Sequence, residues 1–186
     1  LVPFAANVQS TASFTVTDIS GFNQAVDFVN GLVANGATNY EAPLASAITW
    51  LESGEPITGA DNFTYFVSDG MPNRYLNTSG NVASGNANKV MGEVTGADGS
   101  DEVSRINDLS LEVTGVGIGV TPDTLARLDV IDSDGNAIDV QDPTDLDAVF
   151  QDTSPINGRT TGNVITGENG GPGAADHLSQ DDPNIV

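Results

Sequence analysis

The sequence predicts an α/β fold in which helices flank a doubly wound, mostly parallel sheet. Segments with apolar residues at helical spacing alternate with compact runs rich in β-branched and aromatic residues. Strands that are joined through helices run parallel in one sheet, with helices packed on its faces. The chain has 186 residues, which is enough for one domain with a hydrophobic core and some additional sequence.

The N-terminal part predicts two short extended segments and one helix. Residues 1–4 are an apolar run, and residues 13–19 alternate apolar and polar side chains, as a strand or extended segment does. Ser20 is a candidate cap for the helix that follows, and Gly36 suits its end. Its apolar face is formed by Phe22, Val26, Val29 and Val33.

A second helix is predicted by the stretch NYEAPLASAITWL. Thr38 and Glu41 have the spacing of a capping box, and Pro43 falls in the first turn, where no N–H is needed. Trp50 is expected to pack or to be partly exposed. The apolar face comprises Leu44, Ala47, Ile48 and Leu51.

The second half of the chain alternates strands and helices. Residues 62–67 predict a buried strand that ends at Ser68-Asp69-Gly70, and residues 71–101 predict a long loop with a short helix near Val90. Further elements are expected as a helix over 100–109, a strand over 111–120, a helix capped by Thr121, a strand over 137–140 and a helix over 144–150.

Composition separates one domain from a C-terminal linker. Residues 1–156 carry the periodic elements, whereas residues 157–186 are rich in Gly, Asn and Asp and predict a linker that leads into a further module. His177, the only histidine, lies in this tail, and the chain has no cysteine. These counts argue against histidine-based catalysis, disulfides and cysteine-based zinc sites.

The charge excludes some partners. Five basic residues stand against 26 acidic ones, and the net charge of -21 would repel nucleic acid and anionic membranes. No run of the sequence is long enough to span a membrane, so we expect no membrane insertion. The acidity fits either solubility in a salty medium or the use of calcium, which prefers oxygen ligands.

A candidate cation site combines Thr38 with Asp69. In open parallel sheets, ligands bind beyond the carboxyl ends of the strands, where Asp69 is expected. A threonine hydroxyl and a carboxylate are suitable ligands for a hard divalent cation. With so few charges from the protein, the ion could also accept a carboxylate from a partner.

These motifs resemble those of von Willebrand factor A domains, over roughly residues 1–150. GATNYEAPL resembles the threonine motif of the family's metal-ion-dependent adhesion site, and FVSDGMPN resembles its aspartate motif. The resemblance implies a Rossmann-like fold, and it implies that Thr38 and Asp69 bind Mg²⁺, Mn²⁺ or Ca²⁺. From their positions, Tyr40, Met71, Asn73 and Arg74 are expected on the rim near the ligand.

The family's third motif, D-x-S-x-S on the first strand, is not found where it should be. The nearest match is DISGF, which begins at Asp18, offers Ser20, and lies only 20 residues before Thr38. We therefore align residues 1–4 with the family's second strand. The first strand and helix, with the remaining ligands, are then expected upstream of residue 1.

The resemblance favours binding over catalysis. It implies cation-dependent adhesion to a protein or other cell-surface ligand. The tail is similar to repeat modules of large RTX-type adhesins, which are secreted to the bacterial surface by type I secretion. A degenerate spacer domain without a working metal site is the alternative. An enzyme of phosphoryl transfer is disfavoured, because there is no phosphate-binding loop and little basic charge.

The stretch DSDGN, which begins at Asp132, is a second candidate for calcium. An EF-hand loop needs Gly at its sixth position and Glu at its twelfth, but here Ala137 and Pro143 stand there. A β-turn with solvated acids is the expected structure.

Overall fold

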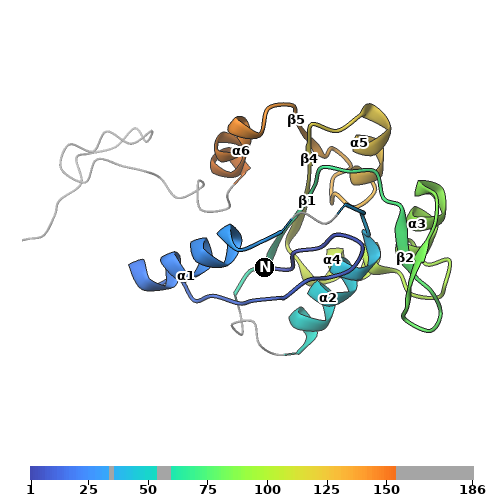
Figure 1. Ribbon diagram of the computed structural model, residues 1–186, viewed down its shortest axis with the longest axis horizontal. Helices are drawn as coiled ribbons and strands as arrows, with labels where there is room; N and C mark the ends of the chain where they lie inside the picture. The colour runs from blue at the N-terminus through green and yellow to red at the C-terminus, as the bar shows by residue number, and fades with distance from the viewer. Residues whose placement is uncertain (34–35, 54–59, 154–186) are drawn as a thin grey trace, which may run out of the picture. The chain divides into compact units, whose positions relative to one another are not determined.

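Three parallel strands form the sheet of the computed structural model, which describes residues 1–33, 36–53 and 60–153 (Figure 1). Their order is β1 (Phe63–Ser68), β4 (Glu112–Ile118) and β5 (Ile138–Val140). β1 pairs with β4 along its whole length, from Phe63 opposite Glu112 to Ser68 opposite Gly117. The α/β class with a parallel sheet flanked by helices is thus confirmed.

The chain divides into two compact units, Leu1–Pro143 and Thr144–Val186. In the described part of the second unit lies α6 (Leu146–Thr153), preceded by a short 3-10 helix (Pro143–Asp145) that begins at the junction. The predicted boundary at residue 156, the linker and His177 lie outside the described residues. The helices of the first unit are α1 (Ile19–Asn30), α2 (Glu41–Glu52), α3 (Ala87–Val94), α4 (Glu102–Leu109) and α5 (Pro122–Leu128).

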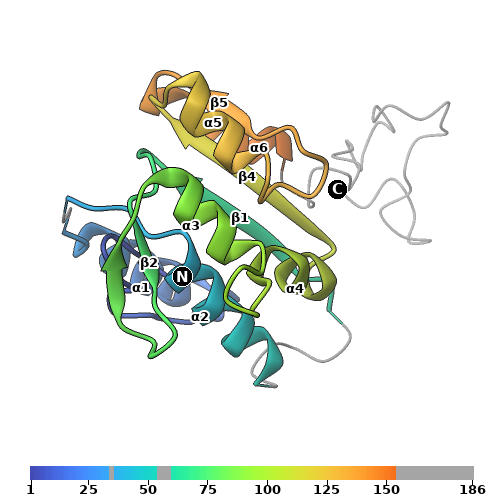
Figure 2. The ribbon, with the colours of Figure 1, turned by 90° about the vertical axis from the view of Figure 1, so that its right-hand side faces the viewer.

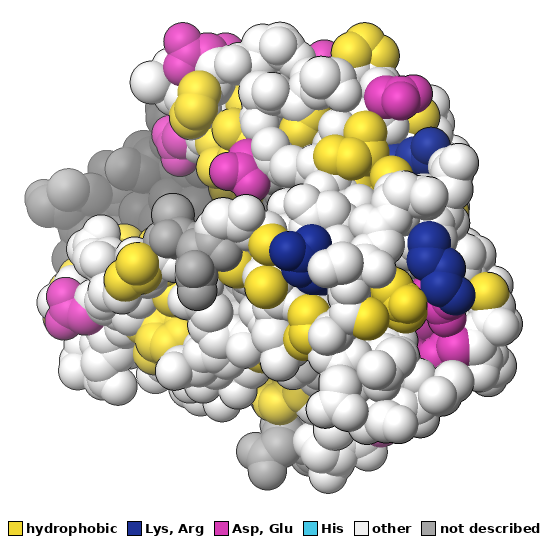
Figure 3. Space-filling model, turned by 45° about the vertical axis from the view of Figure 1, so that its right-hand side comes forward, with side chains coloured by type: hydrophobic (Ala, Val, Ile, Leu, Met, Phe, Trp, Pro, Cys, Tyr) yellow, Lys and Arg dark blue, Asp and Glu magenta, His cyan; other side chains and the backbone are white. Residues whose placement is uncertain are grey.

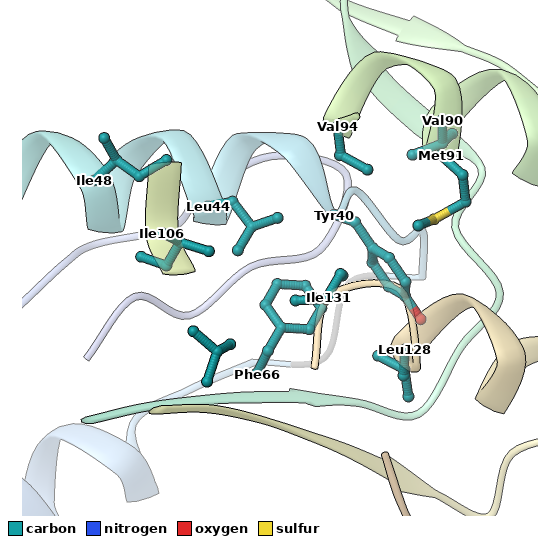
Figure 4. Packing of buried hydrophobic residues seen from close by; sticks show 11 residues of the cluster. Tyr40, Leu44, Ile48, Phe66, Val90, Met91, Val94, Ile106, Leu128 and Ile131 are labelled. Atoms are coloured by element: carbon teal, nitrogen blue, oxygen red, sulfur yellow. The ribbon is translucent and has the colours of Figure 1, made fainter. Parts of the chain in front are cut away.

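The core of the first unit lies between the sheet and helices α2, α3 and α4, which Figure 2 shows on one side of β1. Phe66 of β1 points into this core, where the Tyr40 ring meets it edge-on at a centroid distance of 5.0 Å (Figure 4). Leu44 and Ile48 cover it from α2, and Ile106 does so from α4. The predicted apolar face of α2 is therefore the buried one.

Glycine allows close packing on β4. A Cβ at Gly117 would lie 2.5 Å from Val120 Cγ2 and 3.1 Å from Leu128 Cδ1. The backbone of β4 can approach the C-terminal end of α5 only because no side chain stands there.

The N-terminal region differs from the prediction. Residues 1–4 form no strand of the sheet; Phe4 makes one isolated antiparallel bridge with Val8. Residues 13–18 form no strand either, and α1 begins at Ile19. Asp18 rather than Ser20 caps this helix, through a bond from Gly21 N to Asp18 Oδ1 of 2.9 Å, and the helix ends at Gly31 rather than Gly36.

The predicted capping box at α2 is also wrong. Asn39 supplies the cap, because its Oδ1 accepts from Ala42 N at 3.1 Å. Thr38 instead donates its backbone N–H to Asn73 Oδ1. The Glu41 carboxylate accepts from Leu76 N at 2.7 Å, so it ties α2 to a hairpin far along the chain. Sequence spacing alone could not reveal these distant partners.

We expect Asn39→Ala to lower the free energy of unfolding by about 1–2 kcal/mol, because Asn39 is fully buried and its loss leaves the Ala42 N–H without its cap. Thr38→Ala, the matched control, should cost clearly less, since the backbone bonds of Thr38 persist. Urea unfolding of both variants measures the difference. If Thr38→Ala lowered the free energy of unfolding by as much as Asn39→Ala or more, the Thr38 side chain would cap α2 as the capping box predicts.

The region predicted as a long loop contains a hairpin, formed by β2 (Arg74–Leu76) and β3 (Val82–Ser84). Each strand has only three residues, too few for alternation to be visible. The helix near Val90 is confirmed as α3, and the predicted helices and strands from α4 to β5 are confirmed as well. Within the described ranges, no helix is both long and apolar enough to cross a membrane.

Candidate functional site

The structure brings Thr38 and Asp69 to one place, at the carboxyl end of β1. Thr38 lies in the loop before α2, and Asp69 directly follows β1. Gly70, the neighbour of Asp69, lies against Thr38, because a Cβ added to Gly70 would lie 2.7 Å from Thr38 Oγ1. Thr38 O also accepts from Asn73 N at 2.8 Å and from Arg74 N at 3.0 Å. The threonine loop, which precedes α2, is therefore hydrogen-bonded to the end of the aspartate loop, which follows β1.

Tyr40 holds the aspartate loop in place through a hydrogen bond. Its hydroxyl donates to Gly70 O at 2.9 Å. Burial raises the pKa of Tyr40 to about 12, and the charge of Asp69 contributes to the rise, so the hydroxyl keeps its proton at neutral pH. Ser68 Oγ lies 3.3 Å from both Gly70 N and Gly70 O. These bonds fix the peptide that follows Asp69, while Asp69 itself is exposed.

The four predicted rim residues have different surroundings. Tyr40 is completely buried, so its placement on the rim is wrong; the ring belongs to the core because it packs on Phe66. Asn73 is exposed. Arg74 is half-buried, and its Nη1 donates to Asn73 O at 2.8 Å. Met71 is half-buried, with Sδ 4.0 Å from Thr124 Oγ1.

A groove of about 1390 Å³ runs along β1 and reaches the candidate site. We call it the β1 groove. Its walls are the N-terminal segment, the C-terminal end of α1, α2 and β1 itself. Thr38 and Asp69 line one end, and Asp61 lies at the opposite end of β1. Nothing in the sequence pattern indicated this groove, because its walls come from four separate segments.

The DSDGN stretch forms a turn, but its acids are not all solvated. Asp132 is 9 % exposed, and its Oδ2 accepts from Gly115 N at 2.8 Å in the middle of β4. Its Oδ1 accepts from Asp134 N and Asn136 N. These bonds lock the turn, with Gly135 at a φ of +75°, against the sheet. The Asp132 carboxylate therefore stabilises the turn and holds it against β4.

Within the described residues, no group of three or more His, Cys, Asp or Glu side chains is arranged to hold a metal ion. Sequence reasoning found Thr38 and Asp69 but missed Ser68, Asn39 and Gly70, which position them. The S-D-G triplet was a usable signal for Ser68 and Gly70. For Asn39, the only signal in the sequence was its position directly after Thr38.

On the face drawn in Figure 3, acidic charge is not gathered in one patch. Figure 3 shows a face on which hydrophobic and basic side chains are exposed between scattered acidic ones.

Comparisons of the chain with protein-family models, with curated proteins and with solved structures found no match. The resemblance to von Willebrand factor A domains thus stays a prediction that rests on the threonine and aspartate motifs.

Proposed function

We propose that the chain is a cation-dependent ligand-binding module of the von Willebrand A type, belonging to a secreted bacterial surface adhesin of the RTX type. The observation that carries the proposal is the packing of the Thr38 hydroxyl against Gly70, next to Asp69, at the carboxyl end of β1. The loop with the threonine motif and the loop with the aspartate motif meet there, although 31 positions separate the two residues (69 − 38).

The two residues fit a divalent cation in part. Thr38 offers a neutral hydroxyl oxygen and Asp69 an exposed carboxylate, which are oxygen ligands of the kind that Mg²⁺, Mn²⁺ and Ca²⁺ prefer. Such ions take about six or more oxygen ligands. We propose that the remaining ligands come from water and from a carboxylate of the bound protein or cell-surface ligand.

A spacer domain without a working ion site is the second candidate. It is favoured because no group of three or more His, Cys, Asp or Glu side chains in the described ranges is arranged to hold a metal ion. The two candidates predict different responses to ions, and neither needs catalysis by the chain.

Divalent cations are expected to raise the melting temperature relative to EDTA, because an ion that binds only the folded state stabilises it. At a concentration of 100 times Kd the gain is about 2.7 kcal/mol. Thermal unfolding with Mg²⁺, Mn²⁺ and Ca²⁺ tests this. Asp69→Asn should abolish the gain, whereas Asp108→Asn, an exposed aspartate on α4, should retain it. No gain in the wild-type protein would favour the spacer.

A further inference from the structure

The loop of the β2–β3 hairpin carries an acceptor triplet for N-linked sugars. The triplet is N-T-S, which begins at Asn77 and fits the pattern Asn-x-Ser/Thr with a residue other than proline in the middle. The sequence contains one other such triplet, N-F-T, which begins at Asn62 just before β1. So short a pattern also occurs by chance, and its structural context decides whether it can react. The two triplets have opposite contexts.

Asn77 lies at the tip of the hairpin, which is at the periphery of the first unit in both ribbon views (Figures 1 and 2). Every residue from 77 to 81 is exposed. Asn77 N donates to Asn81 O at 2.9 Å, and Gly80 N donates to Asn77 O at 2.7 Å, so the tip is a closed turn. A Cβ added to Gly80 would meet no described atom within 4 Å. An enzyme can therefore reach the tip while the hairpin stays folded.

The side chain of Asn77 forms an Asx turn. Its Oδ1 accepts from Ser79 N at 3.0 Å and from Asn81 N at 3.1 Å. Because both partners are N–H donors, the oxygen of the planar carboxamide faces the backbone, and Nδ2 lies on the other side of Cγ. Within the described part of the chain, every hydrogen bond of this carboxamide is made by Oδ1. The fold therefore does not use the nitrogen that would carry a sugar.

The triplet at Asn62 is held by the fold at both of its reactive groups. Asn62 Nδ2 donates to Leu109 O at 3.2 Å, and the Thr64 hydroxyl bonds to Ser110 Oγ at 2.6 Å. Asn62 O also accepts from Leu111 N at 2.6 Å. A sugar on this nitrogen would require that these bonds break and that the start of β1 opens, which costs free energy.

Charge also favours the hairpin over the start of β1. Residues 75–88 contain no Asp, Glu, Lys or Arg, in a chain whose net charge is -21. Activated sugars are diphosphate esters with negative charge, so the acidic parts of the chain repel them. Asn62 directly follows such an acid, Asp61. The uncharged hairpin adds no repulsion of its own.

We propose that Asn77 is the acceptor of an N-linked sugar. In the reaction, Asn77 Nδ2 forms a bond to the anomeric carbon of a sugar diphosphate ester, the bond from that carbon to the phosphate oxygen breaks, and the diphosphate leaves. The proton lost by the amide nitrogen passes to a base of the transferase, and no oxidant or reductant is needed. A bulky, polar sugar suits an exposed turn. The modification does not depend on the proposed cation site, since it uses the hairpin tip and not an ion.

The test has two arms, one for each source of sugar diphosphate. One arm uses a soluble N-glycosyltransferase with a nucleotide sugar, and the other uses a membrane-bound oligosaccharyltransferase with a lipid-linked sugar diphosphate. Each enzyme is first given the isolated peptides 61–67 and 74–81, which show its preference for the two triplets without the fold. The folded chain is then treated in the same way. Mass spectrometry of its proteolytic fragments measures the occupancy of Asn77 and of Asn62.

In at least one arm, the 74–81 peptide should be modified and the folded chain should carry sugar on Asn77. Occupancy of Asn62 in the folded chain should be lower by at least on the order of tenfold, because that triplet reacts only after local opening. Ser79→Thr should keep the modification of Asn77. Ser79→Ala should abolish it, because the hydroxyl of the triplet is lost, although the backbone N–H of the Asx turn remains.

Four results would overturn the proposal. They are refusal of the 74–81 peptide in both arms, an unmodified Asn77 in the folded chain when that peptide is accepted, equal occupancy of Asn62 and Asn77 in the folded chain, and full modification of Ser79→Ala. Asn77→Gln identifies the modified residue, since it should remove the sugar from the hairpin fragment and leave the rest of the fragments unchanged.

Discussion

Phe66→Ala is expected to lower the free energy of unfolding by about 3–5 kcal/mol, the range for removal of a buried aromatic ring. Phe66 is 5 % exposed and joins β1 to two other segments. Its ring stacks on Phe4 at 5.4 Å and meets Tyr40 edge-on at 5.0 Å. The change would therefore leave a cavity and also remove two ring pairs, each of which adds to the effect of burial alone.

Phe22→Ala is the matched control, because the same atoms are removed from a ring that is 51 % exposed on α1. It should cost less than about 1 kcal/mol. Urea unfolding with a common slope measures both variants. If Phe66→Ala cost no more than Phe22→Ala, the core would not be organised around β1 as described.

Stability is expected to fall as pH rises through 7, because of Glu41. Burial raises the pKa of Glu41 to about 7 from an ordinary value of 4.5, against the bond from Leu76 N, which lowers it. Between these two values the folded state binds more protons than the unfolded state. The unfolding free energy therefore decreases with pH across this range, by on the order of 2–3 kcal/mol between pH 5 and pH 8.

Further carboxylates near Glu41 contribute to its shift, namely Glu102 of α4, Asp98 of the preceding loop and Glu93 of α3. Among these carboxylates, Glu93 forms an ion pair with Lys89. Burial also raises the pKa of Glu102, so some pH dependence will persist without Glu41. The comparison must therefore be made between variants at each pH.

Glu41→Gln should flatten the pH profile and be at least as stable as the wild-type protein at pH 8, since the neutral amide can still accept from Leu76 N. At pH 5 the two proteins should be nearly equal. Glu112→Gln, at an exposed position on β4, should keep the wild-type slope. Unfolding by urea from pH 5 to pH 8 measures this. Parallel profiles for Glu41→Gln and the wild-type protein would show that Glu41 ionises normally.

The sequence predicted those elements whose signals are local. α5 is an example, because Thr121 and Pro122 mark its start by themselves, and the bond from Thr124 N to Thr121 Oγ1 confirms the cap. β1 and β4 were predicted from runs of β-branched and aromatic residues. The alternating residues 13–18 show the limit of this reasoning, because the pattern of a strand was present but no neighbouring strand was.

Roles that depend on distant partners could not be predicted. Thr38 and Glu41 have the spacing of a capping box, but Asn73 and Leu76 offer better partners across 35 positions in each case. Tyr40 was expected on the rim because of its position near Thr38. Its aromatic ring is instead buried in the core, where it packs against Phe66. Motifs thus located Thr38 and Asp69, whereas packing determined what surrounds them.

The unequal edges of the sheet have a consequence for assembly. Filaments built by strand addition need two complementary open edges on every subunit, one to give and one to receive. Here β1 has six uncharged residues, whereas β5 has only three, with Asp139 among them. The short, charged edge at β5 is a poor partner for strand addition. We therefore expect solutions of the protein to be free of fibres.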